Sequence, residues 1–355
     1  MPPRTVLATR DLCLALFVVF FWALSFPVTE GALSALPPLL VAALRFALVS
    51  LCCLVVPRPA LAWRWIVLIG VFLLIGQYGL LYLGMAQGMP SGMTALVVQA
   101  QVPLTIALAA VTLRERPTVR RTTGLAVSAL GLVLVGVTRG GAIPLAALLL
   151  VLGSGASWAI GNVLIRVAPF TERRADNGFR LVAWTALVPP LPMLLLSFFE
   201  SVPGRGRGVH ADWAALTAAG PRTWLAIGYM VVLGTVAAMS IWFSLLGRYP
   251  ADRVTPFALG IPVLALLLSR VLIHESISAA TLAACAVVLA GLALVVLPGR
   301  TVRRGSKEET GRHAEGDRRV EGAQGVEKAE GAEGRGDGDG AGGAAPEGVE
   351  PVAAG

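Results

Sequence analysis

The chain has 355 residues, 56% of them hydrophobic and only 14% charged, with a formal net charge of +8. A soluble domain is typically about 45–50% apolar and about 25% charged, so this composition excludes an ordinary soluble protein. The positive charge comes from arginines placed between apolar runs, which is typical of one membrane face and indicates no nucleic-acid partner. We therefore expect an all-α integral membrane protein embedded in the lipid bilayer.

Apolar runs close to the length that a bilayer requires, about 20 residues each, predict ten transmembrane helices. We expect these spans at residues 11–30, 37–56, 65–85, 92–113, 121–138, 144–165, 178–199, 222–246, 251–273 and 277–297. Short connections make neighbouring helices antiparallel hairpins, except at a longer loop, 200–221. Residues 299–355 are rich in Gly, Ala, Glu and Arg and contain no aromatic residue, so we expect a disordered C-terminal tail.

The distribution of arginine predicts the orientation of the chain. If the N-terminus lies inside, the inner connections and the flanks of the first and last spans hold 17 arginines. The outer connections then hold only Arg139, Arg205, Arg207 and Arg222. Arginine and lysine are enriched on the cytoplasmic side of membrane proteins. Both termini are therefore predicted to be cytoplasmic, with residues 1–10 as the N-terminal segment.

The two halves of the chain share a pattern of residue spacings. The first half places Gly, Pro, Glu and Gly at positions 88, 103, 115 and 131, and the second repeats these types at 247, 262, 275 and 291. We therefore expect a first repeat at 11–138 and a second at 144–297, each with five spans. An odd number of spans inverts the second repeat across the membrane, and inverted repeats recur in secondary transporters. The pattern thus predicts transport by alternating access.

Two charged residues lie where the bilayer makes charge costly, about 2.5–3.5 kcal/mol on insertion scales. Glu30 ends the first predicted span, and Arg45 lies about eight residues into the second, so the two can face each other across one hairpin. Either they form a substrate or coupling-proton site, with Arg45 binding a carboxylate, or they form a structural ion pair. Pro103 and Pro262 match between the halves and are either helix breaks at a binding site or packing kinks.

Uncharged polar and indole side chains gather in the first, third, fourth and sixth predicted spans. They are Trp22, Ser25, Gln77, Tyr78, Gln99, Gln101, Trp158 and Asn162. Amides in hydrocarbon need hydrogen-bond partners, which are either neighbouring helices or the contents of a hydrated cavity for a small zwitterion. The sequence holds no catalytic motif, phosphate loop or metal-binding pattern, so we expect no catalytic residue, no metal and no cofactor.

Several segments resemble the EamA-type branch of the drug/metabolite transporter superfamily. They are FFWALSFPVTE at 20–30, GMPSGMTALVVQAQ at 88–101, GASWAIGNVLIRVA at 155–168 and LLGRY at 245–249. The second and fourth most resemble the bacterial O-acetylserine/cysteine exporter subgroup. The resemblance implies a multi-pass inner-membrane exporter of small amino-acid-like metabolites with a central cavity between the repeats. It also implies which side chains line that cavity, namely Trp22, Ser25, Gln77, Gln99, Gln101, Trp158 and Asn162.

The chain departs from this subgroup at two positions in the first span. Ala23 stands where similar proteins often carry glycine, and Glu30 stands where they commonly carry lysine. The charge reversal at Glu30 leaves the cargo and the coupling ion open. A carrier of drugs or other metabolites from the same superfamily is the nearest alternative, and a membrane-embedded enzyme or sensor is a more distant one.

Overall fold

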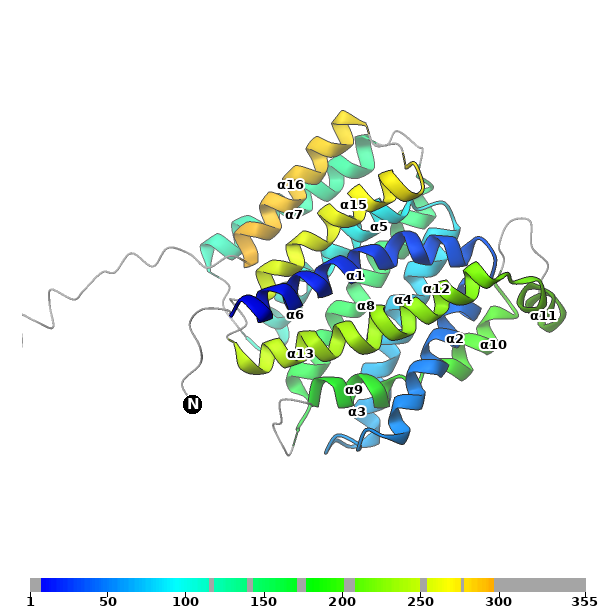
Figure 1. Ribbon diagram of the computed structural model, residues 1–355. Helices are drawn as coiled ribbons and strands as arrows, with labels where there is room; N and C mark the ends of the chain where they lie inside the picture. Colours follow the sequence, from blue (N-terminus) through cyan, green and yellow to red (C-terminus); the bar gives the residue numbers. More distant parts are fainter. Residues whose placement is uncertain are drawn as a thin grey trace, which may run out of the picture. The chain divides into compact units, whose positions relative to one another are not determined.

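The computed structural model describes residues 8–114, 118–138, 143–170, 177–200, 208–249, 254–275 and 278–296. All regular elements within these residues are helical (Figure 1). The predicted tail at 299–355 and most of the predicted N-terminal segment lie outside the described residues, as do Glu115 and several of the arginines counted above.

The first half of the chain contains helices interrupted by short 3-10 and π-helical segments. They are α1 (Thr9–Leu33), α2 (Pro38–Ser50), η1 (Leu51–Leu54), α3 (Trp63–Gly70), η2 (Val71–Gly76), α4 (Gln77–Ala86), α5 (Ser91–Val97), η3 (Val98–Ala100), α6 (Gln101–Thr112) and α7 (Val119–Thr138). The segments η2 and η3 continue their flanking helices, so residues 63–86 and 91–112 each form one long helix.

The second half is built in a related way. Its elements are α8 (Leu145–Val167), α9 (Asn177–Thr185), α10 (Pro190–Ser197), α11 (Val209–Ala218), α12 (Pro221–Val231), η4 (Val232–Ala237), α13 (Ala238–Arg248), η5 (Thr255–Leu259), α15 (Gly260–Leu272) and α16 (Ala279–Val296). η2 and η4 are both π-helical, and η3 and η5 are both 3-10 helical.

Five described helices are long and apolar enough to cross a membrane: Thr9–Leu33, Trp63–Ala86, Ser91–Thr112, Leu145–Val167 and Pro221–Trp242. A sixth is added if the pair Gly178–Thr185 and Pro190–Ser197, bent by 40°, is one span. The span predicted at 178–199 therefore corresponds to a bent helix pair, α9 and α10. Proline lacks the backbone N–H that continues a helix, and Pro189 and Pro190 stand at this bend.

The predicted loop at 200–221 also needs correction, because α11 occupies residues 209–218. The buried side chain of Asp212 accepts a hydrogen bond of 2.5 Å from Ser197 Oγ at the end of α10. Since that contact joins two helices across the connection, a segment expected to be irregular is held as a helix against its neighbour.

The helices pack side by side through small residues. A Cβ added at Gly131 in α7 would lie 2.6 Å from the backbone nitrogen of Val288 in α16. A Cβ added at Gly291 would in turn overlap Ser128. Figure 1 shows α7 and α16 lying together along their lengths. Glycine permits this close approach because it carries no side chain, as in other membrane helix pairs.

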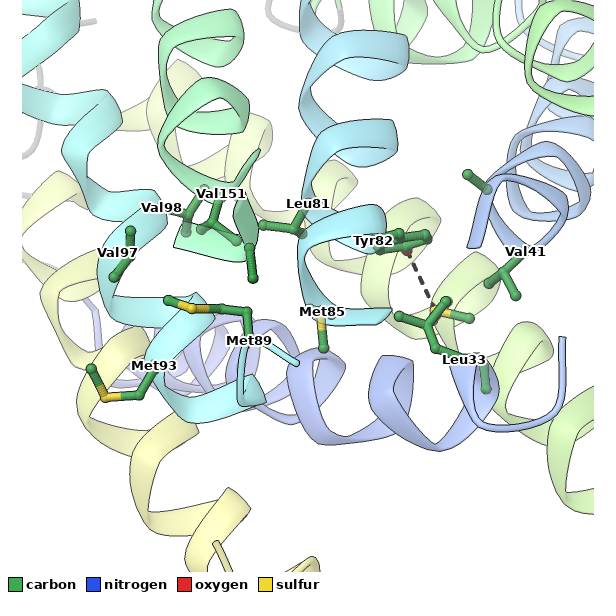
Figure 2. Close-up of a cluster of buried hydrophobic side chains, with 14 of the residues drawn as sticks. Leu33, Val41, Leu81, Tyr82, Met85, Met89, Met93, Val97, Val98 and Val151 are labelled. Carbon is green, nitrogen blue, oxygen red and sulfur yellow. Dashed lines mark hydrogen bonds between the residues drawn. The ribbon is translucent and has the colours of Figure 1, made fainter. Parts of the chain in front are cut away.

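The main hydrophobic cluster has buried members on α1, α2, α4, α5, α8, α10, α12, α15 and α16 and is rich in methionine; Figure 2 shows part of it. Its buried members include Leu33, Val41, Leu81, Met85, Met89, Met93, Val97, Val98 and Val151. Methionine is unbranched and fills irregular gaps between helices. Tyr82 is buried in the same cluster and carries a hydroxyl group into it, so the polar cluster described next borders directly on the hydrophobic one.

Candidate functional site

Arg45 is the centre of a buried cluster that joins α2, α4 and η4. Its side chain is 3% exposed. Nη1 donates to the Tyr82 hydroxyl at 2.6 Å, and Nε and Nη2 donate to Thr235 Oγ1 at 3.2 and 2.8 Å. The Tyr78 ring centre lies 4.5 Å from the guanidinium carbon, which is within cation–π range. These partners are neutral, so within the described residues the positive charge of Arg45 has no carboxylate partner.

Met230, in the last turn of α12, orients the hydroxyls that bind Arg45. Thr235 Oγ1 donates to the Met230 carbonyl oxygen at 2.8 Å, and the Tyr82 hydroxyl donates to Met230 Sδ at 3.6 Å. Figure 2 draws the second of these bonds beside Tyr82. Because both hydroxyl hydrogens point to Met230, both oxygens are left to accept from Arg45. The guanidinium is therefore held in one orientation.

Glu30 lies in a different cluster, at the start of α5. Its Oε2 accepts from the Ser91 backbone nitrogen at 3.2 Å, and Glu275 Oε2 accepts from the Gly92 nitrogen at 3.0 Å. Carboxylates are favoured here because the first N–H groups of a helix lack partners and carry partial positive charge. The structure therefore does not place Glu30 and Arg45 in one ion pair, as the hairpin suggested.

A cavity of about 260 Å³ lies beside this second cluster. Its lining residues are Glu30, Met85, Gly88, Met89, Pro90, Ile273 and Glu275. Of the side chains predicted for the site, Glu30 alone is among the lining residues of this cavity. The cavity therefore belongs with the carboxylates around α5, and the other predicted side chains lie elsewhere.

Gln101 and Asn162, from two different predicted spans, lie within hydrogen-bond distance of each other. Asn162 Nδ2, on α8, lies 3.3 Å from Gln101 Oε1 and 3.3 Å from Thr105 Oγ1, both on α6. Gln77 and Gln99 are also buried, at 2% and 9% exposure. Gln77 Oε1 has no hydrogen-bond partner within the described residues. An unsatisfied buried carbonyl is costly, so this oxygen is a candidate acceptor for a bound N–H group.

The two predicted tryptophans make different contacts. Trp22 Nε1 donates to the Gly234 carbonyl oxygen in η4 at 3.1 Å, which joins α1 to the second half. Trp158, on α8, packs against the main hydrophobic cluster. Ser25 Oγ donates to the Phe21 carbonyl oxygen of its own helix at 2.9 Å. Trp22 therefore contacts the same π-helical segment that holds Thr235, whereas Trp158 contributes to packing.

Pro103 and Pro262 occupy the same place in their helices. Each is the third residue of an α-helix, α6 or α15, that directly follows a 3-10 segment, η3 or η5. A proline in the first turn removes a hydrogen bond to the preceding turn, and that turn is 3-10 helical in both cases. The matching positions in the sequence thus correspond to matching changes of helix type.

Several polar residues that join helices were not predicted. Besides Thr235 and Met230, they include Asp11 at the start of α1, whose Oδ1 accepts from Arg248 Nη1 at 2.9 Å. Asp11 Oδ2 accepts from the Tyr249 hydroxyl at 2.6 Å. A lone aspartate in an apolar span was a usable signal, whereas one threonine among apolar residues was not. Within the described part of the chain, no three His, Cys, Asp or Glu side chains gather where they could share a metal ion.

Several described helices are long and apolar enough to cross a membrane, and polar clusters lie between the helices, as in a multi-pass membrane protein. Comparison with known proteins indicates that the class is a transporter. The sequence model of the EamA-like transporter family matches residues 9–137 and, a second time, residues 145–297. The chain belongs to this family. Membership in a transporter family implies that the protein lies in a membrane and has a small-molecule substrate.

Two curated relatives carry the same name. A protein of Salmonella typhimurium named "Probable amino-acid metabolite efflux pump" is 34% identical over 305 residues, covering 85% of this chain and 99% of the relative. An Escherichia coli protein of that name is 31% identical, covering 81% and 94%. A crystal structure at 20% identity has a TM-score of 0.54 and covers 81% of this chain and 96% of its own. That likeness concerns the fold alone.

Proposed function

We propose that the protein exports small amino-acid-like metabolites, of the cysteine and O-acetylserine class, by alternating access. The observation that carries the proposal is the set of polar side chains that α2, α4, α6, α8 and η4 place between the helices of an otherwise apolar bundle. It offers a cation at Arg45 and an unpaired acceptor at Gln77. A zwitterion needs one group of each kind, because its carboxylate binds donors and its ammonium group binds acceptors.

We further propose that ten spans form two inverted repeats, at 11–138 and 144–297, in the bacterial inner membrane with both termini cytoplasmic. The matched π-helical segments η2 and η4, and the matched 3-10 segments before Pro103 and Pro262, support two related halves. The shorter apolar helices Pro38–Leu54, Phe257–Leu272 and Leu282–Val295 supply further candidate spans. Related halves allow a central site to open to either side in turn.

The candidate lining residues belong to this proposal: Trp22, Ser25, Glu30, Arg45, Gln77, Tyr78, Gln99, Gln101, Trp158 and Asn162. Glu30, at the carboxylate cluster, is the candidate for a coupling proton. The Gln101–Asn162 pair is the candidate polar wall, because both hydrogen bonds from Asn162, at 3.3 Å, are long and can be exchanged for bonds to a substrate.

The test is export of radiolabelled cysteine, O-acetylserine and a panel of other amino acids from proteoliposomes, together with resistance to toxic levels of these metabolites in overexpressing cells. We expect Gln101→Ala and Glu30→Gln to lower export, and Gln87→Ala, at an exposed glutamine, to leave it unchanged. Export of drugs but not of amino acids would favour the alternative cargo class. If Gln101→Ala and Glu30→Gln export as well as wild type, the site is assigned wrongly.

A further inference from the structure

The charge of Arg45 is buried, and no carboxylate among the described residues forms an ion pair with it. The residues around it are Tyr82, Thr235 and Tyr78, all neutral. The carboxylate that the sequence offered as its partner, Glu30, is hydrogen-bonded to the backbone of Ser91 instead. Burying an ion without an opposite charge is strongly unfavourable, so such residues in membrane proteins usually serve a function.

The guanidinium keeps unused hydrogen-bonding capacity. Arginine carries five N–H groups in a planar fork, and the bonds to Thr235 and Tyr82 use one on each of the three nitrogens. The N–H groups that remain belong to Nη1 and Nη2. These two nitrogens commonly bind a carboxylate through paired hydrogen bonds, because their spacing matches that of its oxygens.

The surrounding groups hold the fork still before any anion arrives. Thr235 and Tyr82 accept from Arg45 because their own hydrogens are donated to Met230. The rings of Tyr78 and Phe46 lie 4.5 and 5.7 Å from the guanidinium carbon. A donor that is already oriented loses less conformational freedom on binding, which favours affinity. The same contacts join the two halves of the chain, since Thr235 lies in the second half.

From these contacts we propose that Arg45 binds the carboxylate of the exported substrate, and that Thr235 is the positioning residue that sets the direction of its guanidinium. This inference rests on the proposed function and narrows it: the cargo is an organic carboxylate, and amines that lack the carboxylate are discriminated against. The competing explanation is that Arg45 only ties α2 and α4 to η4, in which case substrate chemistry is irrelevant to it.

The experiment compares substrates that differ only in the carboxylate. Proteoliposomes carry the full-length protein, and transport of radiolabelled cysteine is measured beside that of cysteamine, its decarboxylated analogue, and cysteine methyl ester. The variants are Arg45→Gln, Arg45→Lys, Thr235→Val and Thr235→Ser. Arg270→Gln, at an exposed arginine on α15, is the matched control. Thermal melting of each purified variant with cysteine, propionate or propionamide measures binding separately from transport.

We expect wild type to prefer cysteine over cysteamine at least about tenfold, because a charge-assisted pair is lost with the carboxylate. Arg45→Gln should lose both this preference and the stabilisation by propionate. Arg45→Lys and Thr235→Ser should keep part of the preference for cysteine. Thr235→Val should raise KM for cysteine more than it lowers the maximal rate. The control, Arg270→Gln, should match wild type. Unchanged preference in folded Arg45→Gln would overturn the inference.

The two levels of proposal can fail separately. If wild type transports no amino acid but propionate raises its melting temperature and does not raise that of Arg45→Gln, the carboxylate site is supported and the proposed cargo is wrong. If wild type exports cysteine and Arg45→Gln does the same with equal discrimination, the cargo stands and the site falls. Should Arg45→Gln not fold, the pair Thr235→Val and Thr235→Ser decides, and equal KM values for cysteine in these two variants count against the inference.

Discussion

Asp11 contacts both Arg248 and Tyr249, and the burial of these two partners predicts which contact contributes more to the stability of the protein. These contacts join the start of α1 to the end of α13 through an ion pair of 2.9 Å and a hydroxyl–carboxylate hydrogen bond of 2.6 Å. The Arg248 side chain is 46% exposed, whereas Tyr249 is 3% exposed. Water therefore screens the ion pair, while the hydroxyl bond is shielded.

Magnitudes separate the two contacts. Exposed ion pairs contribute about 0.2–1 kcal/mol to the free energy of unfolding. A buried hydrogen bond to a charged group contributes about 1.5–3 kcal/mol, and we take about 1–2 kcal/mol here because Asp11 lies at a helix end. The Tyr249 hydroxyl also accepts from the Ala8 backbone nitrogen at 3.2 Å, and that bond is lost with it. Tyr249→Phe should therefore destabilise the protein more than Arg248→Gln.

The assay is the free energy of unfolding in mixed detergent micelles, measured by SDS titration for wild type, both single variants and the double variant. We expect Tyr249→Phe to cost about twice as much as Arg248→Gln or more, and the two effects to be less than additive because both act on Asp11. An Arg248→Gln effect equal to or larger than that of Tyr249→Phe would refute the reasoning from burial.

Further predictions concern close helix contacts. Gly291→Leu should destabilise the α7–α16 pair by about 1–3 kcal/mol, because its side chain would overlap the partner backbone. Gly228→Leu, whose Cβ meets no atom within 4 Å, should leave melting unchanged or raise it slightly. Trp22→Phe removes the bond to η4 and should cost about 0.6 kcal/mol, the average for hydrogen bonds between membrane helices. Ser157→Ala, which loses a bond of 2.7 Å to the carbonyl oxygen of Phe72, should cost a similar amount; detergent melting curves check all four variants.

The long apolar helices could be predicted from the sequence because hydropathy over about 20 residues is a strong signal. The expected spans 11–30 and 144–165 agree with α1 and α8 within a few residues. Local changes of helix type could not be predicted. The π-helical segments η2 and η4 have the same apolar composition as the helices around them, and they depend on packing against helices from distant parts of the chain.

The candidate site was predictable where the residue type itself is conspicuous in an apolar span. Gln101 and Asn162 stand out as amides, and they lie within hydrogen-bond distance of each other. Thr235 does not stand out, because threonine is ordinary in membrane helices and its hydroxyl can bond to its own backbone. Its role follows from a contact with Arg45 across 190 residues of chain, and only the fold brings those two side chains together.

Contacts between the halves follow a reciprocal pattern that bears on how the protein could move. Trp22 on α1, in the first half, donates to a carbonyl oxygen of η4 in the second. Ser157 on α8, in the second half, donates to the Phe72 carbonyl oxygen of η2 in the first. A π-helical turn shifts the hydrogen-bonding of the backbone, and such turns are frequent at functional sites.

Each half thus uses a side chain from its first helix to bind the π-helical segment in the other half's third predicted span. If the proposed inverted repeats exchange conformations, these two contacts would exchange roles as the site opens to one side and then the other. Arg45 contacts only one of the two π-helical segments. It binds Thr235 in η4, whereas its partner Tyr82 lies in α4, after η2. Arg45 is bonded to Tyr82 in the first half and to Thr235 in the second, so a carboxylate bound to it would lie between the two halves.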